Sequence, residues 1–275
     1  MSRHQVVAAM ICAGLAAAAT FAFAQSRFSG NNSGRRWARY EAEMQDPIDD
    51  PPDAWVDTEF VFARLRYHSI FDRGGFRRAR WGTDANKSER LFMQGLRRLT
   101  RIQTRSVEEV VDIESDNMFN FPWLYAVGAG DWNITPEQGA RLKEYFERGG
   151  FLMVDDFHND REWNGFMAGI NQMFDNPRVI EIADEDAIFN NVYNMNDRVQ
   201  ISGFQIIYGY PAERGGIVPH WRAVVDSQNR VQVAICFNMD VGDAWEWSDY
   251  PPYPEKLASL AYRLGVNYTI YDLTH

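Results

Sequence analysis

The segment RLKEYFERGGFLMVDDFHND, residues 141–160, contains a helix, a buried strand and a group of polar residues in direct succession. The helical part stops at the glycine pair 149–150, because glycine is the common residue at the end of a helix. The apolar run 151–154 follows as a strand and opens onto Asp155, Asp156 and His158. In an open α/β sheet, ligands bind outside the carboxyl ends of the strands. The segment therefore predicts where a functional site lies, but it does not predict which reaction takes place there.

The flanking sequence continues this alternation of strands and helices. Largely apolar runs predict strands at residues 59–67, 106–113, 121–127 and 179–182. Apolar residues at helical spacing predict helices over about 88–100, 135–149 and 162–174, and the middle one starts with a capping-box pattern at Thr135. Strands that alternate with helices predict right-handed βαβ units and a parallel sheet.

The C-terminal part departs from this alternation. Residues 222–225 and 231–237 are predicted to form a β-hairpin, and residues 199–210 irregular β structure. A final helix is predicted over about 254–266. The fold class is therefore α/β, with a mainly parallel sheet and an added β-hairpin.

The N-terminal residues 1–24 have the three parts of a secretory signal peptide. Arg3 and His4 precede an apolar run at 6–19, and Ala-Phe-Ala at 22–24 matches a cleavage site. The alternative is a membrane anchor, which needs about 20 apolar residues and no cleavage site. We therefore expect a periplasmic or secreted protein with no membrane span after the signal is cleaved.

Charge and cysteine content restrict the partners of the mature chain. The net charge is −10, and an acidic surface repels nucleic acid, so no nucleic-acid partner is expected. Loss of the leader leaves Cys236 as the only cysteine, which excludes an internal disulfide and a metal site made of cysteines. Residues 25–57 are polar and rich in glycine, asparagine, aspartate and proline, which predicts a flexible tether or a loosely packed arm before a domain at 58–275. The sequence leaves open whether Trp37, Tyr40 and Trp55 dock on the domain.

Seven motifs resemble, in order, those of the bacterial family of unknown function DUF4159. They are FARLRY, RWGTD, FPWLYAVGAG, LKEYFERGGFLMVDDF, DAIFNNVY, NMDVGDAWEW and YRLGVNYTIYDLTH. The resemblance covers about residues 59–275. It implies a fold similar to the class I glutamine amidotransferases, which is a flavodoxin-like, doubly wound sheet. It implies no activity.

The resemblance to the amidotransferase fold allows one test of chemistry. In those enzymes a cysteine nucleophile occupies a turn that corresponds here to residues 154–158, VDDFH, which contain no cysteine. A carboxylate cannot replace a thiolate as the nucleophile in glutamine hydrolysis. Amidotransferase activity is therefore not expected.

The candidate catalytic residues are Asp155, Asp156 and His158. Adjacent residues on an extended backbone point to opposite sides, so one aspartate should face the crevice while the other caps a helix or pairs with an arginine. His158 has the chemistry of a metal ligand or a general base. The alternative is a surface histidine that is hydrogen-bonded to its own loop.

Further candidates for ligand binding come from the other motifs. FNMDVGDAWEW follows the strand 231–237 and has oxygen donors at high density, but it lacks the order of ligands found in an EF-hand. The aromatic residues near it suit stacking on a sugar or a peptide, and the alternative is packing under the C-terminal loop. The predicted ligand-binding residues are Asp84, His220, Asn238, Asp240, Asp243, Trp245 and Glu246.

Two functional hypotheses remain open at this stage. The first is an exported domain that binds a small ligand or an envelope protein through the crevice at Asp155, Asp156 and His158. The second is a hydrolase that uses one of Asp155 or Asp156 with His158, with or without a divalent cation held by Asp240, Asp243 or Glu246. No nucleophile elbow is present, so a serine hydrolase is not expected. A P-loop and a dinucleotide-binding glycine pattern are also absent, so no other cofactor is expected. The metal hypothesis requires that these side chains converge in three dimensions.

Overall fold

The computed structural model describes residues 35–45, 47–71 and 80–275. The chain divides into two compact units, residues 1–38 and residues 39–275. Only residues 35–38 of the first unit are described, and the predicted signal peptide lies outside the described residues. The second unit contains the sheet and the candidate site.

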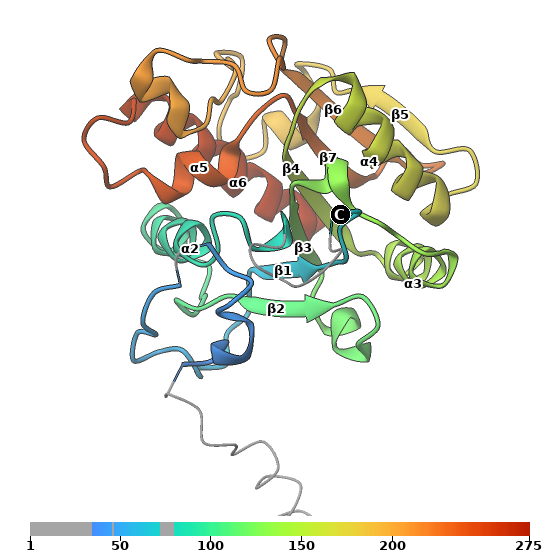
Figure 1. Ribbon diagram of the computed structural model, residues 1–275, viewed down its shortest axis with the longest axis horizontal. Helices are drawn as coiled ribbons and strands as arrows, with labels where there is room; N and C mark the ends of the chain where they lie inside the picture. Colours follow the sequence, from blue (N-terminus) through green and yellow to red (C-terminus); the bar gives the residue numbers. More distant parts are fainter. Residues whose placement is uncertain (1–34, 46, 72–79) are drawn as a thin grey trace, which may run out of the picture. The chain divides into compact units, whose positions relative to one another are not determined.

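The second unit is built on a seven-stranded sheet with the order β2-β1-β3-β4-β7-β6-β5 (Figure 1). Strands β2, β1, β3, β4 and β7 are parallel, whereas β6 is antiparallel to both β7 and β5. If β7 is counted as the fifth strand, the parallel part has the order 2-1-3-4-5 of flavodoxin-like sheets. The predicted fold class, flavodoxin-like α/β with an added hairpin, is confirmed. The strands are β1 (Ala63–Arg66), β2 (Glu109–Asp112), β3 (Trp123–Val127), β4 (Phe151–Phe157), β5 (Arg178–Glu181), β6 (His220–Val225) and β7 (Val231–Phe237).

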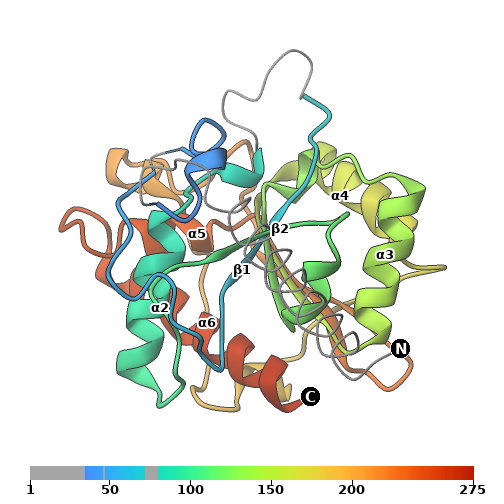
Figure 2. The ribbon, with the colours of Figure 1, turned by 90° about the horizontal axis from the view of Figure 1, so that it is seen from below.

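Helices cover both faces of the sheet. Helices α3 (Pro136–Glu147) and α4 (Asn159–Met173) pack together on one face, and α2 (Lys87–Leu99), α5 (Val241–Glu246) and α6 (Glu255–Thr274) pack together on the other (Figure 2). This two-sided cover explains why β3, β4 and β7 are buried along their whole length. The 3-10 helices are η1 (Ala38–Tyr40), η2 (Arg80–Gly82), η3 (Asp116–Asn120), η4 (Ala129–Asp131), η5 (Ala187–Phe189) and η6 (Phe204–Tyr208).

The signals predicted at both ends of α3 are present. Gln138 N donates to Thr135 Oγ1 over 3.2 Å, and Thr135 N donates to Gln138 Oε1 over 3.1 Å, which completes the capping box. At the other end Gly149 has a φ of +100°, a conformation that L side chains rarely adopt. The sequence thus set both the start and the end of this helix.

Several predicted elements have other bounds in the structure, and the strand predicted at 59–67 is shortened to Ala63–Arg66. Strand β4 continues to Phe157, because Asp155 still pairs with Val127 of β3. Helix α6 continues to Thr274 and includes the TIYDL sequence, because its buried face extends to Tyr268 and Tyr271. The irregular β structure predicted at 199–210 is wrong for 204–208, which form a 3-10 helix.

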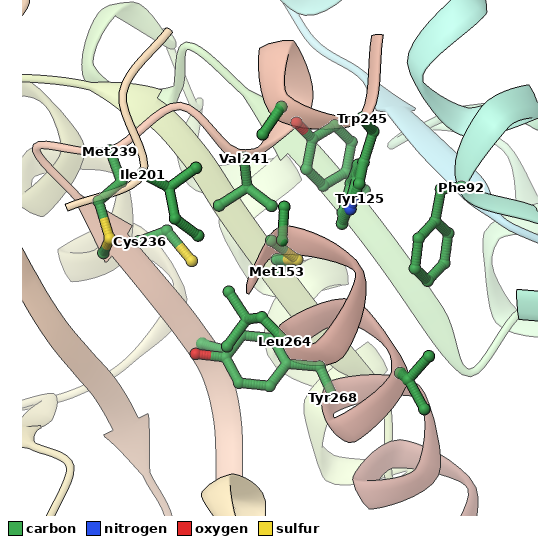
Figure 3. Packing of buried hydrophobic residues seen from close by; sticks show 14 of the residues in the cluster. Phe92, Tyr125, Met153, Ile201, Cys236, Met239, Val241, Trp245, Leu264 and Tyr268 are labelled. Carbon is green, nitrogen blue, oxygen red and sulfur yellow. The ribbon is translucent and has the colours of Figure 1, made fainter. Parts of the chain in front are cut away.

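The hydrophobic core lies between the sheet and the helices α2, α5 and α6. Trp245 of α5 packs against Phe92 of α2 and Tyr125 of β3, with ring centroids 4.6 Å and 5.8 Å apart (Figure 3). Leu264 and Tyr268 of α6 are fully buried in the same cluster. Full burial of one such apolar side chain contributes about 1.5–3 kcal/mol, so this packing holds α5 firmly on the sheet.

Residues 39–45 and 47–57, here called the strap, pack on the domain. Arg66 of β1 donates two hydrogen bonds of 2.9 Å to the carboxylate of Glu43, and Arg90 of α2 pairs with Asp50 at 2.7 Å. The strap thus packs on the domain, an arrangement that the sequence left open beside a flexible tether over 25–57, because ion pairs with the domain offset its ordering entropy. Residues 25–34 of the predicted tether lie outside the described residues.

Within the described part of the chain, no helix is long and apolar enough to span a lipid bilayer.

Candidate functional site

The candidate site lies where β4 ends and bulges away from β7. The register between these two strands shifts between Val154 and Phe157, and Asp156 has a φ of 49°. A bulge redirects side chains, and a positive φ is uncommon for residues other than glycine. The bulge turns Asp155 and Asp156 toward different partners.

Asp155 holds the start of α5. Its side chain is 0% exposed, and its Oδ2 accepts hydrogen bonds from Val241 N at 2.7 Å and Gly242 N at 2.8 Å. Tyr125 Oη donates to the same oxygen over 3.2 Å. Burial raises the pKa of Asp155 to about 8, although the N–H of Gly242 acts in the opposite direction. Asp155 therefore orients the helix that follows β7.

Asp156 is held by two arginines and a histidine. Its Oδ1 lies 2.6 Å from Nη2 of Arg214 and 3.3 Å from Nε2 of His158, and Oδ2 lies 3.9 Å from Nη2 of Arg80. Burial alone would raise the pKa of Asp156, but the contact with His158 and the charges of Arg214 and Arg80 lower it below its usual range. The sequence left open a helix cap or an arginine pair for one of the two aspartates. Asp156 has the arginine pair, whereas Asp155 bonds to the start of α5 and does not cap α4, the next helix in the chain.

His158 is buried at the start of α4 and is only 2% exposed, so it is not a surface histidine. Its backbone N donates to Oε2 of Glu162 over 2.7 Å. The ring contacts Asp156 through Nε2, while Nδ1 is buried and has no hydrogen-bond partner among the described residues. A Cβ added at Gly216 would lie 2.9 Å from Nδ1, so the loop of Gly216 lies close to this nitrogen.

The first turn of α5 brings two more carboxylates together. Asp240 is the N-cap, and its Oδ1 accepts from Asp243 N over 2.9 Å. Asp243 in turn accepts from Phe204 N over 2.6 Å and from Trp247 Nε1 over 3.2 Å. These bonds orient both side chains toward the loop that contains Gly203.

Five buried carboxylates gather at this place, and we call them the carboxylate cluster: Asp84, Glu213, Asp240, Asp243 and Glu246. One oxygen of each of Glu213, Asp240 and Asp243 lies within 4.8 Å of the others, and the same holds for Asp84, Asp243 and Glu246. A third group joins Glu213 to Asp156 and His158 within the same distance. Such groups have the spacing of metal ligands, and an all-oxygen set suits Mg²⁺, Ca²⁺ or Mn²⁺.

Three members of the cluster carry negative charge that no lysine or arginine of the described residues neutralises. Among the described residues, no lysine or arginine forms an ion pair with Asp84, Asp240 or Asp243. Burial is the largest cause of their raised pKa values, and neighbouring carboxylates add to it. Burial and the charge of Asp156 also raise the pKa of Glu213 to about 7. Asp84, Asp240 and Asp243 therefore each need a proton or a cation, whereas Glu213 also has Arg214 at 3.5 Å.

Three predicted ligand-binding residues do not belong to the cluster. Trp245 is 0% exposed in the core, so it offers no surface for stacking (Figure 3). His220 lies at the start of β6, where Nδ1 is 2.7 Å from Oε1 of Glu181. Asn238 holds neighbouring segments, because it accepts from Asn159 N over 3.0 Å and donates to Val218 O over 2.7 Å.

Sequence reasoning missed Glu213 and Arg214. Both lie in a loop, PAERGG, with no strand or recognisable motif beside it. The loop is fixed over the site by a bond from Asn159 Nδ2 to Arg214 O of 3.0 Å and by the bond from Asn238 to Val218. These contacts join segments that are far apart in the sequence, so no local signal could have placed Glu213.

Comparison with known proteins agrees with the resemblance found in the sequence. The model of the family described as "Domain of unknown function (DUF4159)" matches residues 61–273. No curated protein matches the chain.

Proposed function

Since the chain belongs to the DUF4159 family, whose description names no activity, its function must be inferred from its own residues, and we propose that it is an exported hydrolase that depends on a divalent cation. The predicted signal peptide at residues 1–24 supports export. A single observation supports the hydrolase. Glu213 belongs both to the cation-ligand group with Asp240 and Asp243 and to the group with Asp156 and His158.

Because Glu213 belongs to both groups, His158, which can carry a proton, lies beside the proposed cation site. A cation held by Glu213, Asp240 and Asp243 would supply a water of lowered pKa, which is the nucleophile that the chain lacks. His158 is the group that accepts the proton, and Asp156 orients its ring through the 3.3 Å contact with Nε2. Arg214 and Arg80 keep Asp156 charged, so that it does not compete for this proton.

The same geometry disfavours the first hypothesis, a domain that recognises a partner through Asp155 and Asp156. Both carboxylates are buried and bonded to groups of the protein itself. Recognition groups would need to present oxygens to solvent. The inward bonds suit residues that support a site rather than a docking surface.

The test uses the chain from Gln25 and starts with thermal melting in EDTA and with added Ca²⁺, Mg²⁺, Mn²⁺ or Zn²⁺. A cation at 100 times its dissociation constant stabilises the native state by about 2.7 kcal/mol. Hydrolysis of nitrophenyl phosphates, esters and glycosides is then measured with the cation that gives the largest shift. His158→Gln should lower the hydrolysis rate about 10²–10⁴-fold and retain the cation-induced shift.

His220→Gln is the matched control, because His220 is also bonded to a carboxylate but lies outside the cluster. It should leave both readouts unchanged. Melting that no cation alters would refute the proposal. A cation-induced shift in a protein with no hydrolysis would favour the ligand-binding hypothesis.

A further inference from the structure

We propose that the carboxylate cluster holds two divalent cations, bridged by the carboxylate of Asp243. The first position, formed by Glu213, Asp240 and Asp243, rests on the proposed function. The second position, formed by Asp84, Asp243 and Glu246, is the new site. Both use only side chains of the described residues.

The spacing of the oxygens supports two positions. Two ligands of one Ca²⁺ cannot be further apart than twice the metal–oxygen bond, or about 4.8 Å. Each of the two groups meets this limit, and Asp243 is the residue that they share. A carboxylate has two oxygens, so it can ligate two ions about 3.5–4 Å apart, as in two-metal hydrolases.

An unsatisfied oxygen provides a second, independent indication of the new position. Asp84 is only 2% exposed, and its Oδ2 is buried with no hydrogen-bond partner among the described residues. This oxygen would lie 2.6 Å from a Cβ added at Gly242, so it points at the start of α5. A buried carboxylate oxygen without a partner is costly, and a cation is a group that would satisfy it.

The backbone holds Asp84 in this place. Its φ is 61°, its N donates to Gln45 Oε1 over 3.4 Å, and its O accepts from Ser88 N over 3.2 Å. A strained residue that is fixed from both sides is typical of functional sites. The strap thus contributes to the second position through Gln45.

Charge balance also favours two ions. Asp84, Asp240 and Asp243 carry three negative charges when ionised and form no ion pair with lysine or arginine among the described residues, so one divalent cation would leave one of these charges uncompensated. A second cation compensates it. Asp84 and Asp243, which form no ion pair with lysine or arginine within the described part of the chain, would then both be compensated.

The test counts Mn²⁺ ions bound to the full chain by equilibrium dialysis and records their electron paramagnetic resonance spectrum. The wild type should bind two Mn²⁺ per chain, and the spectrum should show a spin-coupled pair. Asp84→Asn should bind one Mn²⁺ and lose the coupling. Asparagine tolerates the left-handed φ of 61°, so this variant should fold, as checked by circular dichroism.

Asp272→Asn is the matched control, because Asp272 is a largely buried carboxylate on α6 that belongs to none of the cation-ligand groups. It should bind two ions. If Asp84→Asn does not fold, Glu246→Gln tests the same position and should also bind one.

One Mn²⁺ in the wild type, unaffected by Asp84→Asn, would overturn the second position and leave the proposed function standing. Two ions without spin coupling would overturn the bridge. No bound ion in the wild type would overturn the proposed function together with this inference.

Discussion

The strap packs with α2, β1 and β2, and these elements, here called the strap side, bury acidic residues as the carboxylate cluster does. The buried acids compared on the strap side pair with arginines, whereas Asp84, Asp240 and Asp243 of the cluster form no ion pair with lysine or arginine among the described residues. Glu43 pairs with Arg66 at 2.9 Å, Glu108 pairs with Arg90 at 3.0 Å, and Glu89 pairs with Arg64. In the cluster, Asp84 and Asp243 are as deeply buried but form no such ion pair within the described residues. Burial alone therefore does not distinguish a structural carboxylate from a functional one.

The partner of a buried acid indicates its role. Breaking a buried ion pair leaves an uncompensated charge, so paired acids make the fold depend on their arginines. An acid without such a partner must take up a proton or bind a cation, and its charge is then available for chemistry. This comparison predicts opposite behaviour for variants in the two regions.

The largest effect is expected on the strap side, for Arg90→Met. The substitution removes one ion-pair partner of both Glu108 and Asp50, and Glu108 is fully buried. We expect the free energy of unfolding to fall by about 3–5 kcal/mol. Urea unfolding monitored by circular dichroism measures this loss.

A control for Arg90→Met comes from an exposed pair, Lys143 with Asp175, whose atoms are 3.0 Å apart. Exposed ion pairs contribute little, so Lys143→Met should leave the unfolding midpoint almost unchanged. Equal losses of stability in the two variants would mean that the buried ion pair contributes no more than the exposed one.

The second effect concerns Asp272, a largely buried acid outside both regions. Both of its oxygens lack hydrogen-bond partners among the described residues, and burial raises its pKa to about 7 from 3.8, with Arg230 acting in the opposite direction. The folded state then binds the proton more tightly than the unfolded state does. Stability should therefore fall as the pH rises from about 4 to about 7 and level off above that range.

Asp272→Asn should remove this contribution. Between pH 5 and pH 8 the free energy of unfolding should change less in the variant than in the wild type, by roughly 2–3 kcal/mol. Urea unfolding at the two pH values, in saturating cation, makes the measurement. Identical pH profiles would mean that Asp272 ionises normally in the folded protein.

The sequence predicted the parts of this site that follow strands. Apolar runs and glycine stops placed β3, α3 and β4, and the position after a buried strand identified Asp155, Asp156 and His158. Asp240 and Asp243 were found in the same way after β7. These predictions succeed because each depends on a local pattern and on one rule for the edge of a parallel sheet.

The remaining features depend on long-range contacts. Glu213 reaches the cluster through a loop held by Asn159 and Asn238, and the strap is held by arginines of β1 and α2. Trp245 turns into the core because Asp155 fixes the start of its helix. Composition and periodicity contain no information about such partners, so the sequence assigned these residues to a tether, to a ligand site, or to nothing.

The smallest of these effects tests the carboxylate cluster by filling space rather than by removing a ligand. A Cβ added at Gly203 would lie 1.9 Å from Glu213 Oε1, 2.7 Å from Asp240 Oδ2 and 2.8 Å from Asp243 Oδ2. The φ of Gly203 is −69°, which alanine adopts without strain, so Gly203→Ala should fold normally and push these oxygens apart. Isothermal titration should show cation affinity at least about tenfold weaker, or about 1.4 kcal/mol. Gly149→Ala is the control and should give the opposite result. Its φ of +100° is strained for alanine, but no atom lies within 4 Å of the added Cβ. That variant should lose stability and retain its cation affinity. Gly203→Ala with unchanged affinity would mean that these three oxygens do not hold a common ion.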